Sequence, residues 1–343
     1  FRRVLFRSNK GVINMNKFKK IGLTALAASL VSVSANAGEL TASGSASITA
    51  SGYSGAIGAA GATSWTMGNS VTMAGSTELD NGMTVSMSFE MDQGTANNSS
   101  LGFDNHSVTI SSDSMGSVKF SGHGGSSATS AMAGTAAGGI WDNFDGTAKK
   151  LGAATIADAI SSNGGGNNSF FYTSPDLMDG LSITASWNPA AAAGVNSMLG
   201  MGVAYTGVEG LTLSYATIDV EGHATTAEGD ETALKASYAY GPVTVSYSNF
   251  STEVGASTAS TDLETTSYGI SYTVSDELSV TYGTEEADRG DTSVDAEYEG
   301  FTVAYTAGGL TLSASMHEGE NVNFANTAGD DVEYWDIGAS FAF

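Results

Sequence analysis

The side chains that most often carry out chemistry are few in this sequence, and they form no recognisable motif. Cysteine is absent, which excludes disulfide bonds, thiolate metal sites and cysteine nucleophiles. A hydrolytic site needs a nucleophile, a base and an orienting group within hydrogen-bonding reach of one another. The four histidines lie in Ser- and Gly-rich segments without a nucleophile motif: His106, His123, His223 and His317. The sequence therefore predicts that the protein is not an enzyme.

Charge is the property through which this chain could act on other molecules. Its 36 Asp and Glu residues outnumber its 12 Lys and Arg residues. Seven basic residues and no acidic residue precede Gly38, so the chain from Gly38 onward has five basic residues and a net charge of −31. Such a surface repels phosphates, which excludes nucleic acid as a partner. It attracts small cations instead.

The N-terminal segment indicates export from the cytoplasm. Residues 15–37 contain a basic stretch, the apolar run Ile21–Val33 and the small residues that end at Ala37, which is the order of a secretory signal peptide. We expect cleavage after Ala37 and a folded domain over residues 38–343. Residues 1–14 precede this signal and are expected to be a non-native or upstream extension. The apolar run is too short for an anchor helix, which needs about 20 residues.

From Gly38 onward, short segments alternate between polar and apolar residues, as strands with one apolar face do. No stretch there reaches the roughly 20 apolar residues of a membrane-spanning helix. We predict sixteen strands: Leu40–Ala50, a segment through Val71 and Met73, Met83–Phe89, His106–Ser112, Ser117–Gly122, Asn168–Ser174, Leu181–Asn188, Gly200–Thr206, Leu211–Asp219, Thr232–Tyr240, Val243–Ser251, Thr265–Val274, Leu278–Glu285, Ala296–Thr306, Leu310–Glu318 and Val332–Phe343.

Short and long connections alternate between these strands. Tight turns such as Asp80–Gly82 and Gly241–Pro242 are followed by long polar loops. This arrangement is typical of an outer-membrane barrel, which must close because an open edge would leave unpaired backbone groups in hydrocarbon. We therefore predict an all-β fold, a 16-stranded antiparallel transmembrane β-barrel with short periplasmic turns and long external loops. In Ala296–Tyr305 the alternation slips at Gly300, where we expect a bulge.

The apolar register of the strands also carries aromatic residues near strand ends, which suits the aromatic girdles of such barrels. These are Trp187, Tyr205, Tyr215, Tyr238, Tyr240, Tyr247, Tyr272, Tyr282, Phe341 and Phe343. A β-rich secreted sandwich or solenoid would bury its apolar face without needing girdles. The barrel is the better prediction.

Four segments carry a resemblance to a known family: Glu78–Val85, Gly116–Gly122, Asn168–Pro175 and the terminal Phe343. In their order and spacing, the chain resembles the Gram-negative porins of the alphaproteobacterial type from Gly38 to its end. The resemblance implies a general-diffusion porin of the outer membrane, a homotrimer, and a third long loop folded into the lumen. That loop is His123–Asn167 here. Phe343 matches the terminal residue by which the assembly machinery recognises such barrels.

The resemblance places the constriction of the pore at that loop, where Asp142, Asp145 and Asp158 are the candidate acids. The polar register adds five lumen-facing candidates: Lys119, Lys235, Glu78, Glu90 and Glu285. Porins of this kind set loop carboxylates against an arginine cluster, yet this chain has a single arginine, Arg289, after Gly38. Since ions respond to the charges at the narrowest point, we predict a pore for small hydrophilic solutes that prefers cations and needs no cofactor.

Further acids are expected to form a solvated outer mouth: Asp230, Glu231, Asp262, Glu264, Asp288, Asp291, Asp330 and Asp331. Pairs such as Asp330 and Asp331 could bind Ca²⁺, although no loop has the regular acidic spacing of a dedicated site. Outer-membrane lipid and lipopolysaccharide are the expected surroundings. Two alternatives stay open, a substrate-selective channel and a structural or adhesive barrel. A phosphate channel would need more basic residues, and a sugar channel would need aromatic residues on the polar register.

Overall fold

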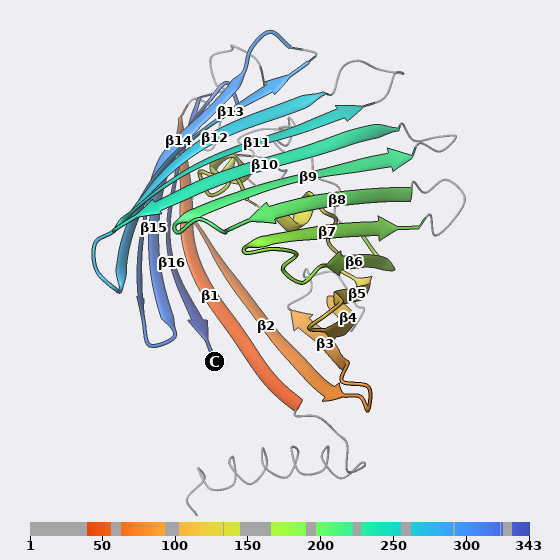
Figure 1. Cartoon of the computed structure of the whole chain (residues 1–343). Coiled ribbons are helices and arrows are strands. Elements are labelled where there is room, and N and C mark those ends of the chain that lie inside the picture. The colour runs from red at the N-terminus through yellow and green to blue at the C-terminus, as the bar shows by residue number, and fades with distance from the viewer. Residues whose placement is uncertain are drawn as a thin grey trace, which may run out of the picture.

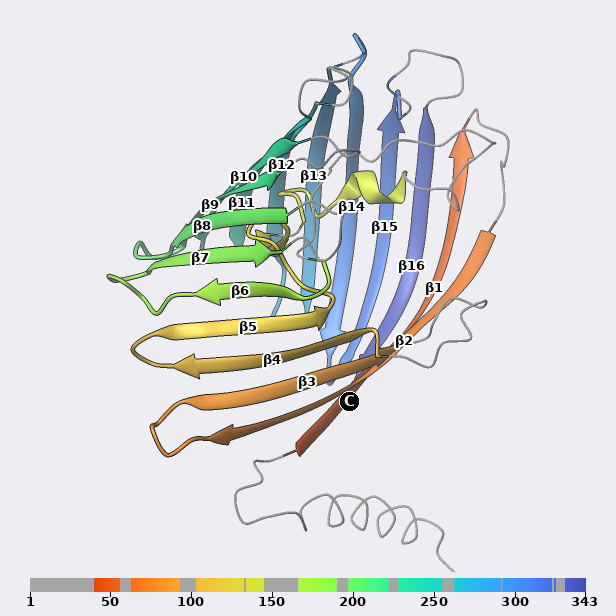
Figure 2. The ribbon, with the colours of Figure 1, turned by 90° about the vertical axis from the view of Figure 1, so that its right-hand side faces the viewer.

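The computed structural model is a closed barrel of sixteen antiparallel strands, which confirms the predicted fold class (Figures 1 and 2). The structure describes residues 40–55, 63–92, 103–132, 134–144, 166–189, 197–221, 228–254, 262–290, 292–322, 324 and 331–343. The signal peptide, its cleavage at Ala37 and the domain start lie outside these residues and stay predictions. Within the described part of the chain, no helix is long and apolar enough to cross a membrane.

The strands follow one another around the barrel in chain order, and β1 closes the ring against β16. Their bounds are β1 Leu40–Gly55, β2 Thr63–Glu78, β3 Thr84–Asp92, β4 Asn105–Ser112, β5 Gly116–His123, β6 Ser169–Thr173, β7 Leu181–Asn188, β8 Ser197–Tyr205, β9 Leu211–Glu221, β10 Gly229–Tyr240, β11 Val243–Val254, β12 Leu263–Thr273, β13 Leu278–Arg289, β14 Ala296–Ala307, β15 Leu310–Glu320 and β16 Val332–Ala342. Closure leaves no unpaired edge strand.

Short turns gather at one rim of the barrel, which we call the short-turn rim, and long connections at the other, the long-loop rim (Figure 2). In the turn between β2 and β3, the Leu79 N–H donates to the Met83 carbonyl at 2.7 Å. The Asn81 side-chain oxygen accepts from the Met83 N–H at 3.1 Å, and Gly82 has a φ of 78°. Glycine is favoured there because L side chains rarely adopt that conformation. The chain ends at the short-turn rim, where Phe343 pairs with Gly44.

Near the short-turn rim, the strands carry apolar side chains outward and small polar side chains inward. Val303 on β14 faces outward and is 40% exposed, whereas Thr302 faces the lumen. All the girdle aromatics named above lie on the outward register, as predicted. The outer wall therefore suits hydrocarbon and the inner wall suits water.

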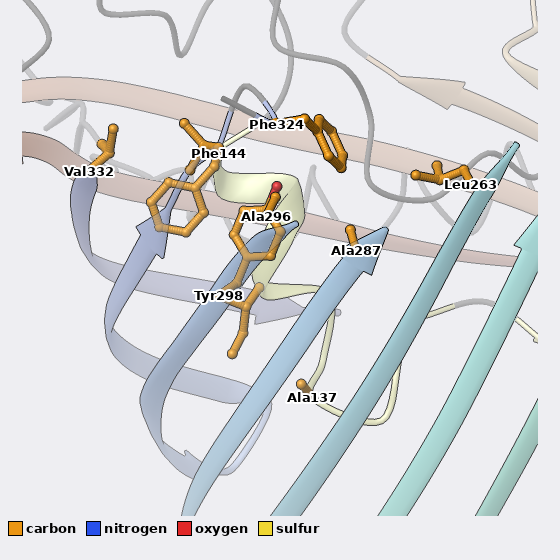
Figure 3. Packing of buried hydrophobic residues seen from close by; sticks show 10 residues of the cluster. Ala137, Phe144, Leu263, Ala287, Ala296, Tyr298, Phe324 and Val332 are labelled. Carbon is orange, nitrogen blue, oxygen red and sulfur yellow. The ribbon is translucent and has the colours of Figure 1, made fainter. Parts of the chain in front are cut away.

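Near the long-loop rim, the pattern is reversed on β9–β16. Carboxylates face outward there: Asp219, Glu221, Asp230, Glu253, Glu264, Glu286, Asp288, Glu297, Glu299, Glu318, Glu320 and Glu333. Inward-facing apolar side chains pack with residues from the loops into a buried cluster: Ala137, Ile140, Phe144, Leu263, Ala287, Ala296, Tyr298, Val322, Phe324 and Val332 (Figure 3). These strand ends thus have a core on the lumen side.

This reversal explains why the sequence pattern slips at Gly300. The expected bulge is wrong, because Gly300 pairs regularly with Gly283 on β13 and with His317 on β15. On the long-loop side of Gly300, Tyr298 faces inward and Glu299 outward, so the polarity changes and the register does not. A register shift occurs instead between His106 and Ser107 on β4.

Candidate functional site: the lumen and its constriction loop

The connection between β5 and β6, which we call loop 3, lies inside the barrel, as predicted (Figure 2). The structure describes residues 124–132, 134–144 and 166–168 of it. Two short 3₁₀ helices occur there, η1 (Ser130–Met132) and η2 (Ile140–Asn143). Loop 3 follows the inner wall from β7 to β15, and each contact below joins it to an inward-facing side chain of a strand.

Glu285 on β13 attaches loop 3 to the wall. One carboxylate oxygen accepts from the Trp141 N–H at 2.8 Å, and the other accepts from the Thr135 hydroxyl. The Gly139 N–H donates to the Thr135 hydroxyl oxygen at 2.8 Å. Glu285 therefore binds loop 3 at two points, before and within η2.

This geometry corrects one expectation about the constriction. Glu285 faces the lumen, as its register predicts, but it is 3% exposed beneath loop 3. Its role is to fix the loop, and it does not line the pore.

Lys235 and Glu231 on β10 attach the first half of loop 3 in the same way. The Lys235 ammonium donates to the carbonyl oxygens of Met132 at 2.9 Å and Gly134 at 2.7 Å. Glu231 accepts from the Thr129 hydroxyl at 3.0 Å and is 2% exposed. Lys235 is therefore a loop anchor as well as an inward-facing cation, and the prediction that Glu231 lies in a solvated outer mouth is wrong.

Small wall residues let the loop backbone approach the strands. A Cβ placed on Gly269 of β12 would lie 2.1 Å from the Ala136 carbonyl oxygen, and one on Gly283 of β13 would lie 2.5 Å from Ala137 Cβ. Gly269 and Gly283 are directly opposite each other, so they form a trough for this part of the loop. Ser248 and Ser246 beside it bind the Ala136 N–H at 2.8 Å and the Ala136 carbonyl at 3.0 Å.

The end of η2 is held by side chains of β1 and β15. The Tyr53 hydroxyl donates to the Asn143 carbonyl at 2.8 Å, and the Asn143 side-chain amide lies 2.9 Å from His317 Nδ1. His317 faces inward and is partly buried. Phe144 then inserts its ring beside Tyr298, with 5.5 Å between ring centroids (Figure 3).

The inner face of β2–β5, which we call the open side, lies across the ring of strands from β10–β13. Ser and Thr side chains dominate its inward register. Lys119 is its basic residue, between Thr109 and Phe171 on the neighbouring strands. Glu78 is exposed near the short-turn rim, and Glu90 accepts from the Asn105 side-chain amide at 2.7 Å nearer the long-loop rim.

Three more acids lie within the barrel, and Arg289 of β13 also faces inward near the long-loop rim. Asp142 on η2 is exposed. Asp92 on β3 and Asp336 on β16 also face inward and escaped the sequence prediction, although their register was sufficient to find them. Asp145 and Asp158, the other loop candidates, lie outside the described residues.

The structure brings together some of the predicted site residues and separates others. Asp142 lies on the loop, and Glu90 and Lys119 lie on the open side. Lys235 and Glu285 are taken up by loop attachment. Among the described residues, no group of three His, Asp or Glu side chains is placed to hold a metal ion. Asp330, named for possible Ca²⁺ binding, lies outside them, and Asp331 is exposed.

Comparison with known proteins agrees with this architecture. A family model described as Gram-negative porin matches residues 22–306. No curated protein sequence matches the chain.

Several solved structures are similar in fold. The anion-selective porin from Comamonas acidovorans is 17% identical, with a TM-score of 0.64 over 89% of this chain and 99% of that one. A loop L8 deletion mutant of OmpT, an outer membrane protein of Vibrio cholerae, is 14% identical, with a TM-score of 0.66 over 90% and 100%. The trimer form of OmpT is 12% identical, with a TM-score of 0.63 over 90% and 100%.

Proposed function

We propose that this chain, which belongs to the family of Gram-negative porins, forms a passive pore that cations cross more readily than anions. Family and fold locate the barrel in the outer membrane, with the short-turn rim in the periplasm and the long-loop rim outside. Proteins of this family are channels and not enzymes. The finer proposal concerns the solutes: small hydrophilic molecules and ions that diffuse without chemistry or a cofactor.

The charge of the part of the lumen that loop 3 leaves open is the observation that carries the cation preference. Among the described side chains there, Lys119 is opposed by Glu78, Glu90 and Asp92, and Asp142 is exposed on loop 3. Lys235 adds a second positive charge, partly buried and bound to loop carbonyls, but these four acids still outnumber the two lysines. Carboxylates at a narrow point raise the local concentration of cations.

The Comamonas acidovorans porin is named anion-selective, although its fold is similar to that of this chain. The shared fold therefore gives no support to the cation preference. That proposal rests on the charges that line the lumen of this chain.

Planar-bilayer recording tests the proposal. The refolded chain from Gly38 to Phe343 is placed under a KCl gradient, and step conductance and reversal potential are read together. We expect open steps with a reversal potential that shows cation preference, reduced in Glu90→Gln and Asp142→Asn. A Glu297→Gln variant is the matched control, because Glu297 lies on the outer face of the barrel. Anion-directed or unselective currents from folded barrels would contradict the proposal.

We further propose that the protein is a homotrimer whose subunits meet through the exterior of β1–β8. The outward register of these strands has no carboxylate among the described residues, whereas that of β9–β16 has many near the long-loop rim. Two acidic surfaces would repel each other on contact. Current steps in groups of three, together with a trimer mass after cross-linking, are expected, and single steps from a monomer would contradict this.

The remaining partners follow from the same surfaces. The apolar outer wall would contact lipid, and the strand ends with outward carboxylates would lie at the level of the lipopolysaccharide head groups. We propose that Phe343, 76% exposed at the short-turn rim, is the residue that the assembly machinery recognises. Slower assembly of a Phe343→Ala barrel in native membranes, with unchanged refolding in detergent, would support this role.

A further inference from the structure

The connection between β15 and β16 reaches loop 3 inside the outer end of the barrel. We call its three described residues Asn321, Val322 and Phe324 the latch. Val322 and Phe324 are 0% and 2% exposed, and both belong to the cluster that contains Phe144 of loop 3 (Figure 3). A Cβ placed on Gly319 would lie 2.7 Å from Val322 Cγ1 and 3.2 Å from Phe144 Cδ1. The latch and loop 3 therefore meet above Gly319.

The backbone of the latch is in an unfavourable conformation. Phe324 has a φ of 57°, in the left-handed region that bulky L residues rarely adopt, whereas Asn321, with a φ of 51°, is a residue type that adopts it readily. The Phe324 N–H donates to the Asn321 carbonyl at 2.7 Å, which closes a tight turn. Strain of this kind persists only where the surrounding contacts outweigh it, and it often marks a functional segment.

The contacts that oppose this strain come from the barrel wall and from the same loop. The Arg289 guanidinium of β13 lies 4.6 Å from the centroid of the Phe324 ring, a cation–π contact. The Asn321 N–H donates to the Asp331 carboxylate at 3.3 Å. Burial of Val322 and Phe324 adds the hydrophobic contribution. Side-chain contacts thus hold the latch in place despite its unfavourable backbone conformation.

We propose that Val322 and Phe324 are positioning residues for the constriction, and that the latch alternates between a seated and a released state that changes the mobility of loop 3. Loop 3 is fixed to the wall by Glu285, but on the side of the long-loop rim its Phe144 is covered by the latch. Release would uncover Phe144 and leave η2, with its exposed Asp142, held from one side. This inference rests on the proposed function, since it assumes that the lumen conducts.

The expected result is a change in the fluctuation of the current. Conduction depends on the narrowest point of the pore, so a loop that moves more produces more transitions between current levels. We expect Phe324→Ala to raise the frequency of these transitions by about tenfold or more, because loss of a buried Phe shifts an equilibrium by at least that factor. The matched control is Phe103→Ala. Phe103 is 52% exposed near the same rim, against Phe89 on the exterior.

A reversible cross-link gives the converse test. The chain has no cysteine, so Val322→Cys with Phe144→Cys introduces a single pair at the point where the latch meets loop 3. Oxidation should suppress the transitions, and reduction of the same channel should restore them. Formation of the bond is checked by the mass of the oxidised protein.

The outcomes separate this inference from the proposed function. If folded barrels carry no current, the proposed pore function is contradicted. Currents whose transitions are the same in wild type, in Phe324→Ala and in the oxidised and reduced cross-link variant would overturn the latch and leave the pore intact. If Phe324→Ala does not fold, as judged by heat-modifiable migration on a gel, the oxidised and reduced states of the cross-link variant decide the question alone.

Discussion

β14 runs through both the membrane-embedded part of the barrel and its outer end, so the two parts can be compared within one strand. Toward the periplasm, Val303 faces out and Thr302 faces in, the arrangement that lipid outside and water inside require. Toward the external loops, Glu297 faces out and Tyr298 faces in, the arrangement of a strand in a water-soluble protein. The strand pairing is continuous through both parts. The surroundings of a strand therefore decide which face is apolar, and they change along its length.

The largest expected effect is on stability, when a lysine is placed in one or the other of the two parts of β14. Val303→Lys puts an ammonium on the lipid-facing wall, which costs about 2–4 kcal/mol near the middle of a bilayer. Glu297→Lys puts the same group six positions away on the same face. There it would meet Glu286 and Glu320, which lie directly opposite Glu297 on β13 and β15. Opposite charges across strands contribute about 0.2–1 kcal/mol per pair, so a gain is expected.

The measurement is the free energy of unfolding of both variants in lipid vesicles, from reversible urea titration followed by tryptophan fluorescence. A loss of stability in both variants would show that lipid extends to Glu297. Two unaffected variants would show that Val303 does not contact hydrocarbon.

The same comparison explains what the sequence could and could not predict. All sixteen strands were predicted, because alternation with an apolar outward face is strong in the membrane-embedded part. The outer ends were missed on several strands, for example Glu286–Arg289 of β13, where outward Glu286 and inward Ala287 reverse the pattern. The polarity rule that identified the lower part of each strand does not apply there.

Register also predicted whether each charged residue lies on the inner or the outer face of the wall. It did not predict whether loop 3 covers that residue. Glu285, Lys235 and Glu90 were all correctly placed on the inner face. Loop 3 covers the first two, and this depends on contacts between residues that are up to about 150 positions apart, such as Thr135 and Glu285. A single sequence contains no local signal for such a contact. Gly269 and Gly283 were a partial signal, since glycine on an inner face indicates close backbone approach.

A second, intermediate effect should distinguish the covered wall from the open side of the lumen. Glu285→Ala would leave the N–H of Trp141 and the hydroxyl of Thr135 without their acceptor, at a cost of about 1–3 kcal/mol for each unsatisfied group. We expect amide exchange at Gly139–Trp141 to accelerate by about tenfold or more. Glu90→Ala on the open side is the control, and it should leave these amides unchanged.

Hydrogen–deuterium exchange with mass spectrometry on the refolded barrel measures both variants. Equal protection of the Gly139–Trp141 segment in wild type and Glu285→Ala would show that the wall contact of Glu285 does not hold the loop. Acceleration in Glu90→Ala as well would show that loop 3 responds to the charge of the lumen as a whole.

The smallest expected effect concerns the outward carboxylates. Glu297 has a like charge directly opposite it on both neighbouring strands, which is unfavourable at short range. Raising NaCl from physiological strength to 1 M shortens the screening length from about 8 Å to about 3 Å, so this repulsion should weaken. The urea midpoint of wild type should therefore rise with salt. The midpoint should rise less in Glu297→Gln, because the variant lacks both repulsive pairs. The difference between the two proteins in the free energy of unfolding gained with salt should be less than about 1 kcal/mol. The general effect of salt on burial is common to both proteins and cancels in the comparison. An identical salt response would mean that counter-ions already neutralise these carboxylates at low salt.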